Sequence, residues 1–188
     1  MHALASSSDG APGLAGAVRR AQRGDEEGFE ELMSLTQRRV AAVAYRMLGT
    51  SDEARDAAQE VYLRVHRFLH RFRADEDLNA WLYRLTVNVC HDMRRKRRPS
   101  VPLVEAPAQT EDAERATLLW ERAALLRRAL RELPEKERRA LVLRDLEGLD
   151  TAEVARILGS SAGTVRSQIC SARRRVHALL AGVLGRER

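Results

Sequence analysis

The strongest constraint on the fold is a set of helix-boundary signals near the C-terminal end of the chain. Asp150 and Glu153 have the D-x-x-E spacing of a capping box, which predicts a helix that begins directly after Asp150. Gly159 lies where that helix must end with a positive φ, and Ser160 and Ser161 offer the next N-cap. These signals predict two helices joined by a tight turn.

The predicted helix pair is also basic. Ala155 is small enough to let the two helices cross closely, and Gly159 follows four residues later. Residues 150–188 contain seven arginines and three acidic residues. An ordinary αα-hairpin with a solvated basic face is the alternative, but caps, turn glycine, small crossing residue and charge all agree with a DNA-binding unit. We therefore predict a helix-turn-helix over residues 151–170 that binds DNA.

The composition is typical of small helical domains whose partner is a polyanion. The 188 residues are 44% hydrophobic but only 4% aromatic, and the formal net charge is +6. Two cysteines far apart in helical patterns do not predict a disulfide framework. We find neither a membrane-spanning run nor a signal peptide, so we expect a cytoplasmic protein without membrane insertion.

Helical periodicity extends over most of the remaining chain, with no strand-like alternation. Pro134 is expected in the first turn of a helix. The stretch from Pro99 to Glu114 breaks the pattern, with three prolines, four acidic residues and no basic residue. We predict an all-α fold of two small helical domains joined by a flexible acidic linker. The predicted segments are a disordered N-terminus (1–12), a first domain (13–98), the linker (99–113) and a second domain (114–188).

A second basic region lies between residues 64 and 98. Residues 64–73 contain four arginines, two histidines and no acid, and residues 84–98 contain six cations and one acid. Phe72 and Trp81 lie among these cations, an arrangement that suits single-stranded nucleic acid, whose phosphates attract cations and whose bases stack on aromatic rings. Taken alone, the aromatic residues fit a core and the arginines a solvated helix end equally well. The predicted helix-turn-helix on the same chain favours nucleic-acid binding.

Four segments, in order, resemble the extracytoplasmic-function (ECF) subfamily of bacterial RNA polymerase sigma factors. They are DEARDAAQEVYLRV (52–65), WLYRLTVNVCHDMRR (81–95), LPEKERRALVL (133–143) and EVARILGSSAGTVRS (153–167). The resemblance covers about residues 14–182. It implies a sigma factor that binds the β′ and β subunits of core polymerase and directs promoter-specific initiation. It further implies recognition of the −35 duplex, melting and capture of the −10 element, and an anti-sigma factor as a partner.

The resemblance also implies three sets of site residues. The core-polymerase set is Asp52, Asp56, Gln59, Glu60, Tyr62 and Leu63. The −10 set is Arg73, Asp75, Asn79, Trp81, Arg84, Asn88, Arg94 and Arg95. The −35 set is Ser161, Gly163, Thr164, Arg166, Ser167, Gln168, Ser171, Arg173 and Arg174. The acids of the first set lie four apart on one helical face, where the resemblance implies docking onto a basic coiled coil of β′.

The −35 unit departs from the family pattern. Gln168 and Ser171 stand where relatives commonly have arginines, and an arginine bound to guanine is worth about 1–3 kcal/mol of discrimination. The usual −35 consensus of the family therefore should not be assumed, and Gln168 suits adenine instead.

Other functional classes have weaker support. His66 and His70 lie at i and i+4 without a third ligand nearby in sequence, so no metal is expected. Cys90, His91 and Asp92 diverge around a helix and cannot converge on one substrate. We therefore expect neither an enzyme nor a cofactor. A stand-alone helix-turn-helix regulator and a sigma-mimicking adaptor that titrates an anti-sigma factor remain as alternatives.

Overall fold

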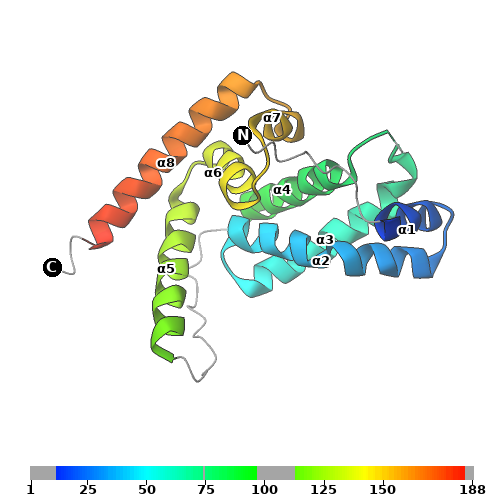
Figure 1. Ribbon diagram of the computed structural model, residues 1–188, viewed down its shortest axis with the longest axis horizontal. Helices are drawn as coiled ribbons and strands as arrows, with labels where there is room; N and C mark the ends of the chain where they lie inside the picture. Colours follow the sequence, from blue (N-terminus) through cyan, green and yellow to red (C-terminus); the bar gives the residue numbers. More distant parts are fainter. Residues whose placement is uncertain (1–11, 74, 97–112, 185–188) are drawn as a thin grey trace, which may run out of the picture.

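The chain folds entirely into helices and their connections in the computed structural model, which describes residues 12–73, 75–96 and 113–184 (Figure 1). The first domain contains α1 (Pro12–Gln22), α2 (Glu26–Leu48), α3 (Ser51–Phe68), the 3-10 turn η1 (Leu69–Arg71) and α4 (Leu78–Lys96). The second contains α5 (Ala113–Glu132), α6 (Glu135–Leu141), the π-helical turn η2 (Val142–Leu146), α7 (Thr151–Leu158) and α8 (Ala162–Leu184). The described residues contain no strand, so the all-α prediction is confirmed.

Two predicted segments fall mainly outside the described residues. They are the disordered N-terminus over 1–12 and the linker over 99–113. Pro12 and Ala113, which those predictions included, already belong to α1 and α5. No helix in the described ranges is both long and apolar enough to cross a membrane.

The helix boundaries of the helix-turn-helix are those that the local sequence predicts. Asp150 Oδ1 accepts a hydrogen bond from the Glu153 backbone N–H at 2.8 Å, and Glu153 Oε2 accepts one from the Asp150 N–H at 2.7 Å. Gly159 ends α7 with φ 61°, a left-handed conformation that costs glycine little. Ser161 Oγ accepts from the Thr164 N–H at 3.0 Å and caps α8.

The chain before the helix-turn-helix differs from the sequence prediction. Pro134 does not lie in the first turn of α6 but precedes it as the N-cap residue, with φ −53° and ψ 143°. Its extended ψ keeps it outside the helix, although its fixed φ suits either position. The helix then widens into η2, where the Glu147 N–H donates to the Val142 carbonyl at 3.0 Å, five residues back.

The first domain is built around the antiparallel pair α2 and α3, with α4 packed against both and α1 across the N-terminal half of α2 (Figure 1). Gly28 makes that crossing close, because a Cβ there would lie 2.5 Å from Arg20 Cβ. Six side chains are among those completely buried between the helices: Leu32, Met47, Val61, Val65, Leu82 and Val87.

In the second domain, α6, α7 and α8 pack around a smaller aliphatic core. Helix α5 contacts α8, and the two helices then diverge (Figure 1). Leu130, Leu143, Val154, Val165 and Ala172 are buried there. The buried residues of both domains form one contiguous cluster, because α4 contacts α7 and α2 contacts α5. The described helices of the two domains therefore pack against each other.

Candidate docking groove and nucleic-acid surfaces

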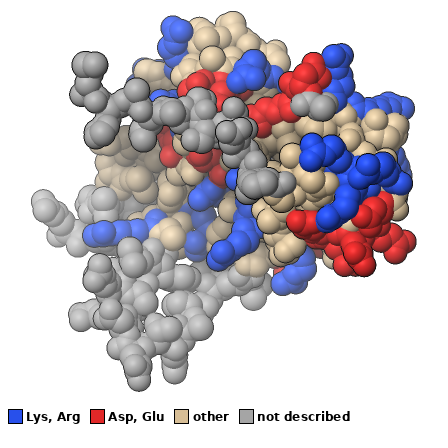
Figure 2. All heavy atoms as spheres, turned by 45° about the vertical axis from the view of Figure 1, so that its right-hand side comes forward, with Lys and Arg blue, Asp and Glu red and all other residues tan. Residues whose placement is uncertain are grey.

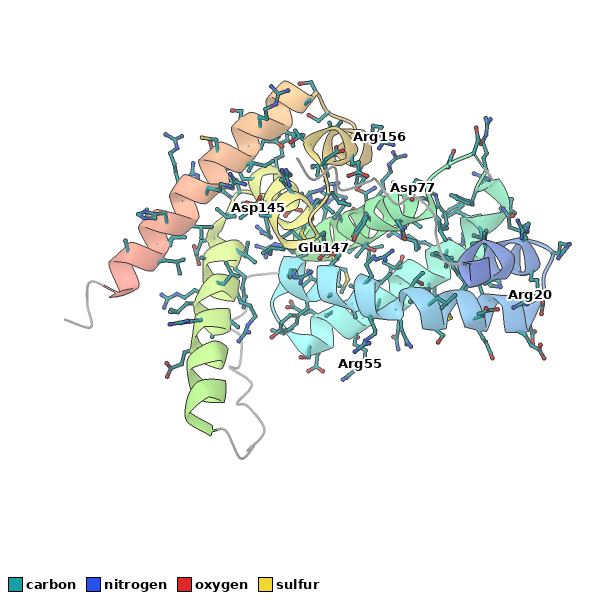
Figure 3. The ribbon with its side chains drawn as sticks, in the orientation of Figure 1. Arg20, Arg55, Asp77, Asp145, Glu147 and Arg156 are labelled. Atoms are coloured by element: carbon teal, nitrogen blue, oxygen red, sulfur yellow. The ribbon has the colours of Figure 1, made fainter. Side chains whose placement is uncertain are left out.

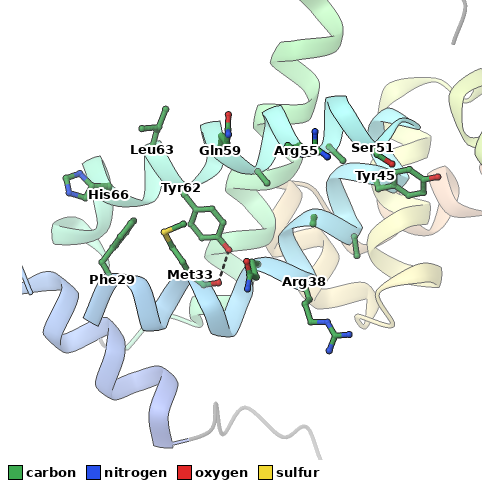
Figure 4. A pocket seen from close by; sticks show the side chains of 15 residues that line it. Phe29, Met33, Arg38, Tyr45, Ser51, Arg55, Gln59, Tyr62, Leu63 and His66 are labelled. Carbon is green, nitrogen blue, oxygen red and sulfur yellow. Dashed lines mark hydrogen bonds between the residues drawn. The ribbon is translucent and has the colours of Figure 1, made fainter. Parts of the chain in front are cut away.

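An apolar groove with a volume of about 1350 Å³ runs between α2 and α3 (Figure 4). Phe29, Met33 and Tyr45 of α2 form one wall, and Leu63 and His66 belong to the wall from α3. The side chain of Leu63 has an exposed fraction of 66%, which is high for a large apolar residue. An exposed leucine beside an apolar groove is typical of a surface that another protein covers.

Three residues of the predicted core-polymerase set line this groove. Gln59 and Leu63 are exposed, whereas Tyr62 is buried in its floor. The Tyr62 hydroxyl lies 2.9 Å from Thr36 Oγ1 and donates to the Met33 carbonyl at 3.5 Å. Burial raises the pKa of this phenol. Tyr62 therefore offers its ring to the groove, while its hydroxyl is bonded within the fold.

The acids of the same set do not form the uniform stripe that the spacing predicts. Asp52 is exposed and accepts from Arg55 Nη1 at 3.2 Å. Asp56 is exposed and has no hydrogen bond or ion pair with any described residue. Glu60 is half-buried and accepts from Arg64 Nε at 2.8 Å. Asp56 is thus the acid of this set whose charge is available to a partner.

The loop before α4 is held by local polar contacts. Arg73 and Asp75 form a bidentate ion pair at 2.9 and 3.0 Å, and both are exposed. Asp77 caps α4 by accepting from the Asn79 backbone N–H at 2.8 Å (Figure 3). The Asn79 side-chain carbonyl accepts from Arg39 of α2. The polar groups predicted to meet a base are therefore present at the surface, each bonded within the first domain.

Trp81 follows this loop and is half-buried. Its ring centroid lies 5.5 Å from that of Phe72, a buried side chain. Phe72 therefore belongs to the core, whereas part of the Trp81 ring remains accessible.

Further along α4, three residues of the predicted −10 set contact the second domain. Arg84 donates to the Arg156 carbonyl at 3.0 Å and to the Ile157 carbonyl at 3.3 Å. Asn88 Oδ1 accepts from Arg139 Nη2 at 2.8 Å. Arg94 donates to the Arg131 carbonyl at 3.4 Å, while Arg95 is exposed. These bonds join α4 to α5, α6 and α7 of the second domain.

The predicted −35 set gathers at the N-terminal half of α8. Gly163, Arg166 and Ser167 are exposed, whereas Gln168 and Ser171 are half-buried. The side-chain hydroxyls of Ser161 and Thr164 are 2.9 Å apart, which ties the first turn of α8 together.

The arginines of the next turns are not equivalent. Arg173 forms a bidentate pair with Asp145 of η2 at 2.8 and 2.6 Å, and this bond raises the pKa of the Arg173 guanidinium. Arg175 pairs with Glu137 of α6 at 3.1 Å. Arg174 is exposed, and among the described residues it has no ion-pair partner. Arg166 and Arg174 are therefore the free cations of this predicted set.

Surface charge is mixed elsewhere. Figure 2 shows lysine and arginine side chains close to aspartate and glutamate side chains on the face turned toward the viewer. Arg20, for example, pairs with both Asp25 and Glu31 near α1. The charge of +6 is thus distributed in patches, and individual unpaired arginines matter more than the net charge.

Two family models match the chain: "Sigma-70 region 2" over residues 32–99 and "Sigma-70, region 4" over residues 123–176. The RNA polymerase sigma-H factor of Pseudomonas aeruginosa is 34% identical over 180 residues, which span 89% of this chain and 93% of that protein. The chain belongs to the ECF family of RNA polymerase sigma factors. It is a sigma factor that recognises promoters, and its two helical domains match sigma regions 2 and 4.

Other ECF sigma factors show similar agreement. The ECF sigma factor SigM of Mycobacterium tuberculosis is 36% identical over 160 residues, 84% of this chain and 79% of that protein. The sigma-E factor of Escherichia coli is 34% identical over 169 residues, 83% and 88% of the two chains. A solved structure of CnrH in complex with the cytosolic domain of CnrY has a TM-score of 0.69 and 25% identity, and covers 90% of this chain and 98% of that chain.

The docking face was predicted on α3, and the α2 wall of the groove was not predicted. The sequence did contain a signal for this wall, because Phe29, Met33 and Tyr45 belong to one row of positions spaced at four residues. A separate row that includes Leu32 faces the core. Two apolar rows on one helix indicate two packing surfaces.

Proposed function

We propose that this sigma factor docks on core RNA polymerase through the α2–α3 groove and the adjoining Asp56 carboxylate. The observation that carries the proposal is an apolar groove with a highly exposed Leu63 and an unpaired acid beside it. An apolar centre with a charged rim is the usual composition of a protein interface. A basic coiled coil of the β′ subunit offers the complementary apolar and positive side chains. The groove is also the place where we expect an anti-sigma helix, a proposal supported by the likeness to CnrH in its complex with CnrY.

The −10 and −35 contacts follow the same division of the chain. In this proposal, residues 13–98 carry the −10 set on α4 and the preceding loop, residues 99–113 link the domains, and residues 114–188 carry the −35 set on α8. The protein acts without enzymatic activity, in the cytoplasm, by positioning polymerase and capturing bases. Support comes from the exposed Arg166 at the start of α8 and the partly accessible Trp81 ring beside the polar loop.

The −10 assignment is tested with Asn88→Ala. The substitution removes a base-capturing amide but leaves the cations Arg94 and Arg95, so open-complex formation on duplex promoters should fall about tenfold or more. A promoter whose −10 region is already unpaired should lose much less, because strand separation is no longer required. The rates of open-complex formation by reconstituted holoenzyme on the two templates give the measurement. Equal losses on both templates would make Asn88 a structural residue.

The −35 assignment is tested by selecting promoters from a random pool with reconstituted holoenzyme. Arg166→Ala should relax the selected sequence at one or two −35 positions and cost about 1–3 kcal/mol on the best site. Arg174→Ala is the matched control, because it removes another exposed arginine of the same helix. It should weaken all sequences alike and reduce the salt dependence of binding by about one counterion. Ser171→Arg should shift the selection toward the promoters of relatives. Uniform weakening by Arg166→Ala would identify Arg166 as a phosphate contact instead.

A further inference from the structure

The second domain covers the part of α4 to which the −10 contacts are assigned. The Asn88 carbonyl oxygen is bonded to Arg139 of α6, and the Arg84 guanidinium is bonded to carbonyls of α7. While Asn88 keeps this bond, its side-chain carbonyl is not free to bind a base edge. Arg84 likewise cannot follow a phosphate while it remains on α7. A −10 strand that binds Asn88 and Arg84 must therefore first break these bonds with the second domain.

Glu147 is the residue that ties the second domain to two helices of the first. Its side chain is 8% exposed and pairs with Arg46 of α2. Its other carboxylate oxygen accepts from the Tyr83 hydroxyl of α4 at 3.2 Å. Figure 3 shows Glu147 at the junction between the second domain and the helices of the first. Burial, together with the Glu147 charge, raises the pKa of Tyr83 to about 12, so the phenol remains a donor at neutral pH.

The position of Glu147 depends on η2. The π-helical turn ends at Leu146, and the Glu147 N–H completes it by bonding to the Val142 carbonyl. An extra residue per turn changes the direction in which the next side chain points. Glu147 thus emerges toward α2 and α4 rather than along the face of α6.

A second set of contacts holds α5 against the end of α2. The Arg127 guanidinium lies 5.5 Å from the centroid of the Tyr45 ring, which lines one end of the groove. Gly49 faces Arg131, and a Cβ at Gly49 would lie 3.0 Å from Arg131 Cδ. Contacts between the two domains are therefore found from the −10 face of α4 to the edge of the groove.

We propose that the free protein rests in a closed conformation in which Glu147, held by Arg46 and Tyr83, keeps the second domain over the −10 face of α4. This contact must open before Arg84 and Asn88 bind DNA. The statement that the second domain keeps DNA from α4 rests on the assignment of −10 contacts to α4 under the proposed function. The closed contact itself rests on the bonds of Glu147 with Arg46 and Tyr83, and does not depend on that assignment.

Interdomain distances test the closed contact. One spin label is placed on the native Cys170, which is exposed on α8, and another on Arg67→Cys, an exposed position of α3; Cys90 is buried and stays unlabelled. The free protein should give one narrow distance distribution, that of the closed arrangement. Arg46→Glu and Glu147→Arg each place like charges together, and each should raise the ratio of open to closed molecules by about tenfold or more. The double variant restores opposite charges and should return the narrow distribution of the closed arrangement.

The same variants test occlusion with a fluorescent single-stranded DNA of random sequence, titrated against the free protein. Both single variants should bind it more tightly than the double variant, by about tenfold. They change the net charge in opposite directions, so a gain in both cannot come from charge alone. Arg19→Glu, on the exposed surface of α1, is the control for the charge lost in Arg46→Glu, and should keep the narrow distribution of the closed arrangement.

Each result decides a separate point. A broad distance distribution in the unmodified free protein, or single variants that leave a narrow distribution unchanged, would overturn the closed contact. Distances that open without tighter DNA binding would overturn the occlusion. The −10 assignment is decided by a separate experiment, which compares holoenzyme carrying Asn88→Ala on duplex and on pre-opened templates.

Discussion

Asp56→Arg combined with Gln59→Ala should abolish binding to core polymerase while leaving the helix content unchanged. The Asp56 carboxylate is exposed and has no partner among the described side chains, so its replacement breaks no internal ion pair. Gln59 lines the groove, and its truncation removes a polar contact at the same place. A like charge facing a basic partner costs several kcal/mol, so we expect affinity to fall at least about a hundredfold.

The measurement is a titration of labelled core polymerase, with circular dichroism to verify helicity. Glu121→Arg is the control, because it makes the same change in net charge at an exposed position of α5. The control should bind core polymerase as the unmodified protein does. Undiminished affinity of the Asp56→Arg, Gln59→Ala variant would exclude the proposed docking face.

Arg138→Met should cause a large loss of stability. The Arg138 side chain is buried and donates to the carbonyl of Leu130 in the last turn of α5 at 2.8 Å and to that of Leu133, just after α5, at 2.6 Å. Desolvation by burial lowers its pKa to about 10, so the guanidinium is still charged at neutral pH. Methionine fills similar space but leaves both carbonyls without this donor. We expect the free energy of unfolding to fall by about 3 kcal/mol.

Urea denaturation of the full chain, followed by circular dichroism, measures this loss. Arg128→Met is the control, because Arg128 is an exposed arginine of α5, the helix that Arg138 contacts from α6. The control should change the free energy of unfolding by less than about 0.5 kcal/mol. Equal midpoints for the two variants would show that Arg138 does not hold the junction between α5 and α6.

The helix boundaries could be predicted because their causes are local. The capping box joins Asp150 to Glu153, and Gly159 ends α7 through its own φ, so neighbouring residues contain all the required information. The contact between Arg46 and Glu147 spans 101 positions and follows no local pattern. The same holds for Asn88 and Arg139, 51 positions apart. Such contacts depend on how the helices pack, which spacing along one helix does not determine.

The groove could be predicted only in part. Its α3 wall was found through family resemblance, while its α2 wall was visible only as a second apolar row. The π-helical turn had no sequence signal, because widening a helix by one residue requires support from tertiary packing. That support includes the bond between Arg173 and Asp145, which joins α8 to the turn.

The contact between Arg84 and α7 affects the rigidity of the helix-turn-helix. In the closed arrangement it satisfies the Ile157 carbonyl, one of the terminal groups of α7 that have no partner within the helix. When the domains separate, water must replace this donor. The C-terminal turn of α7, which directly precedes α8, then loses a contact that held it to α4. The scaffold that orients α8 on a promoter should therefore be softer, and more adaptable to its site, than the scaffold of the resting protein.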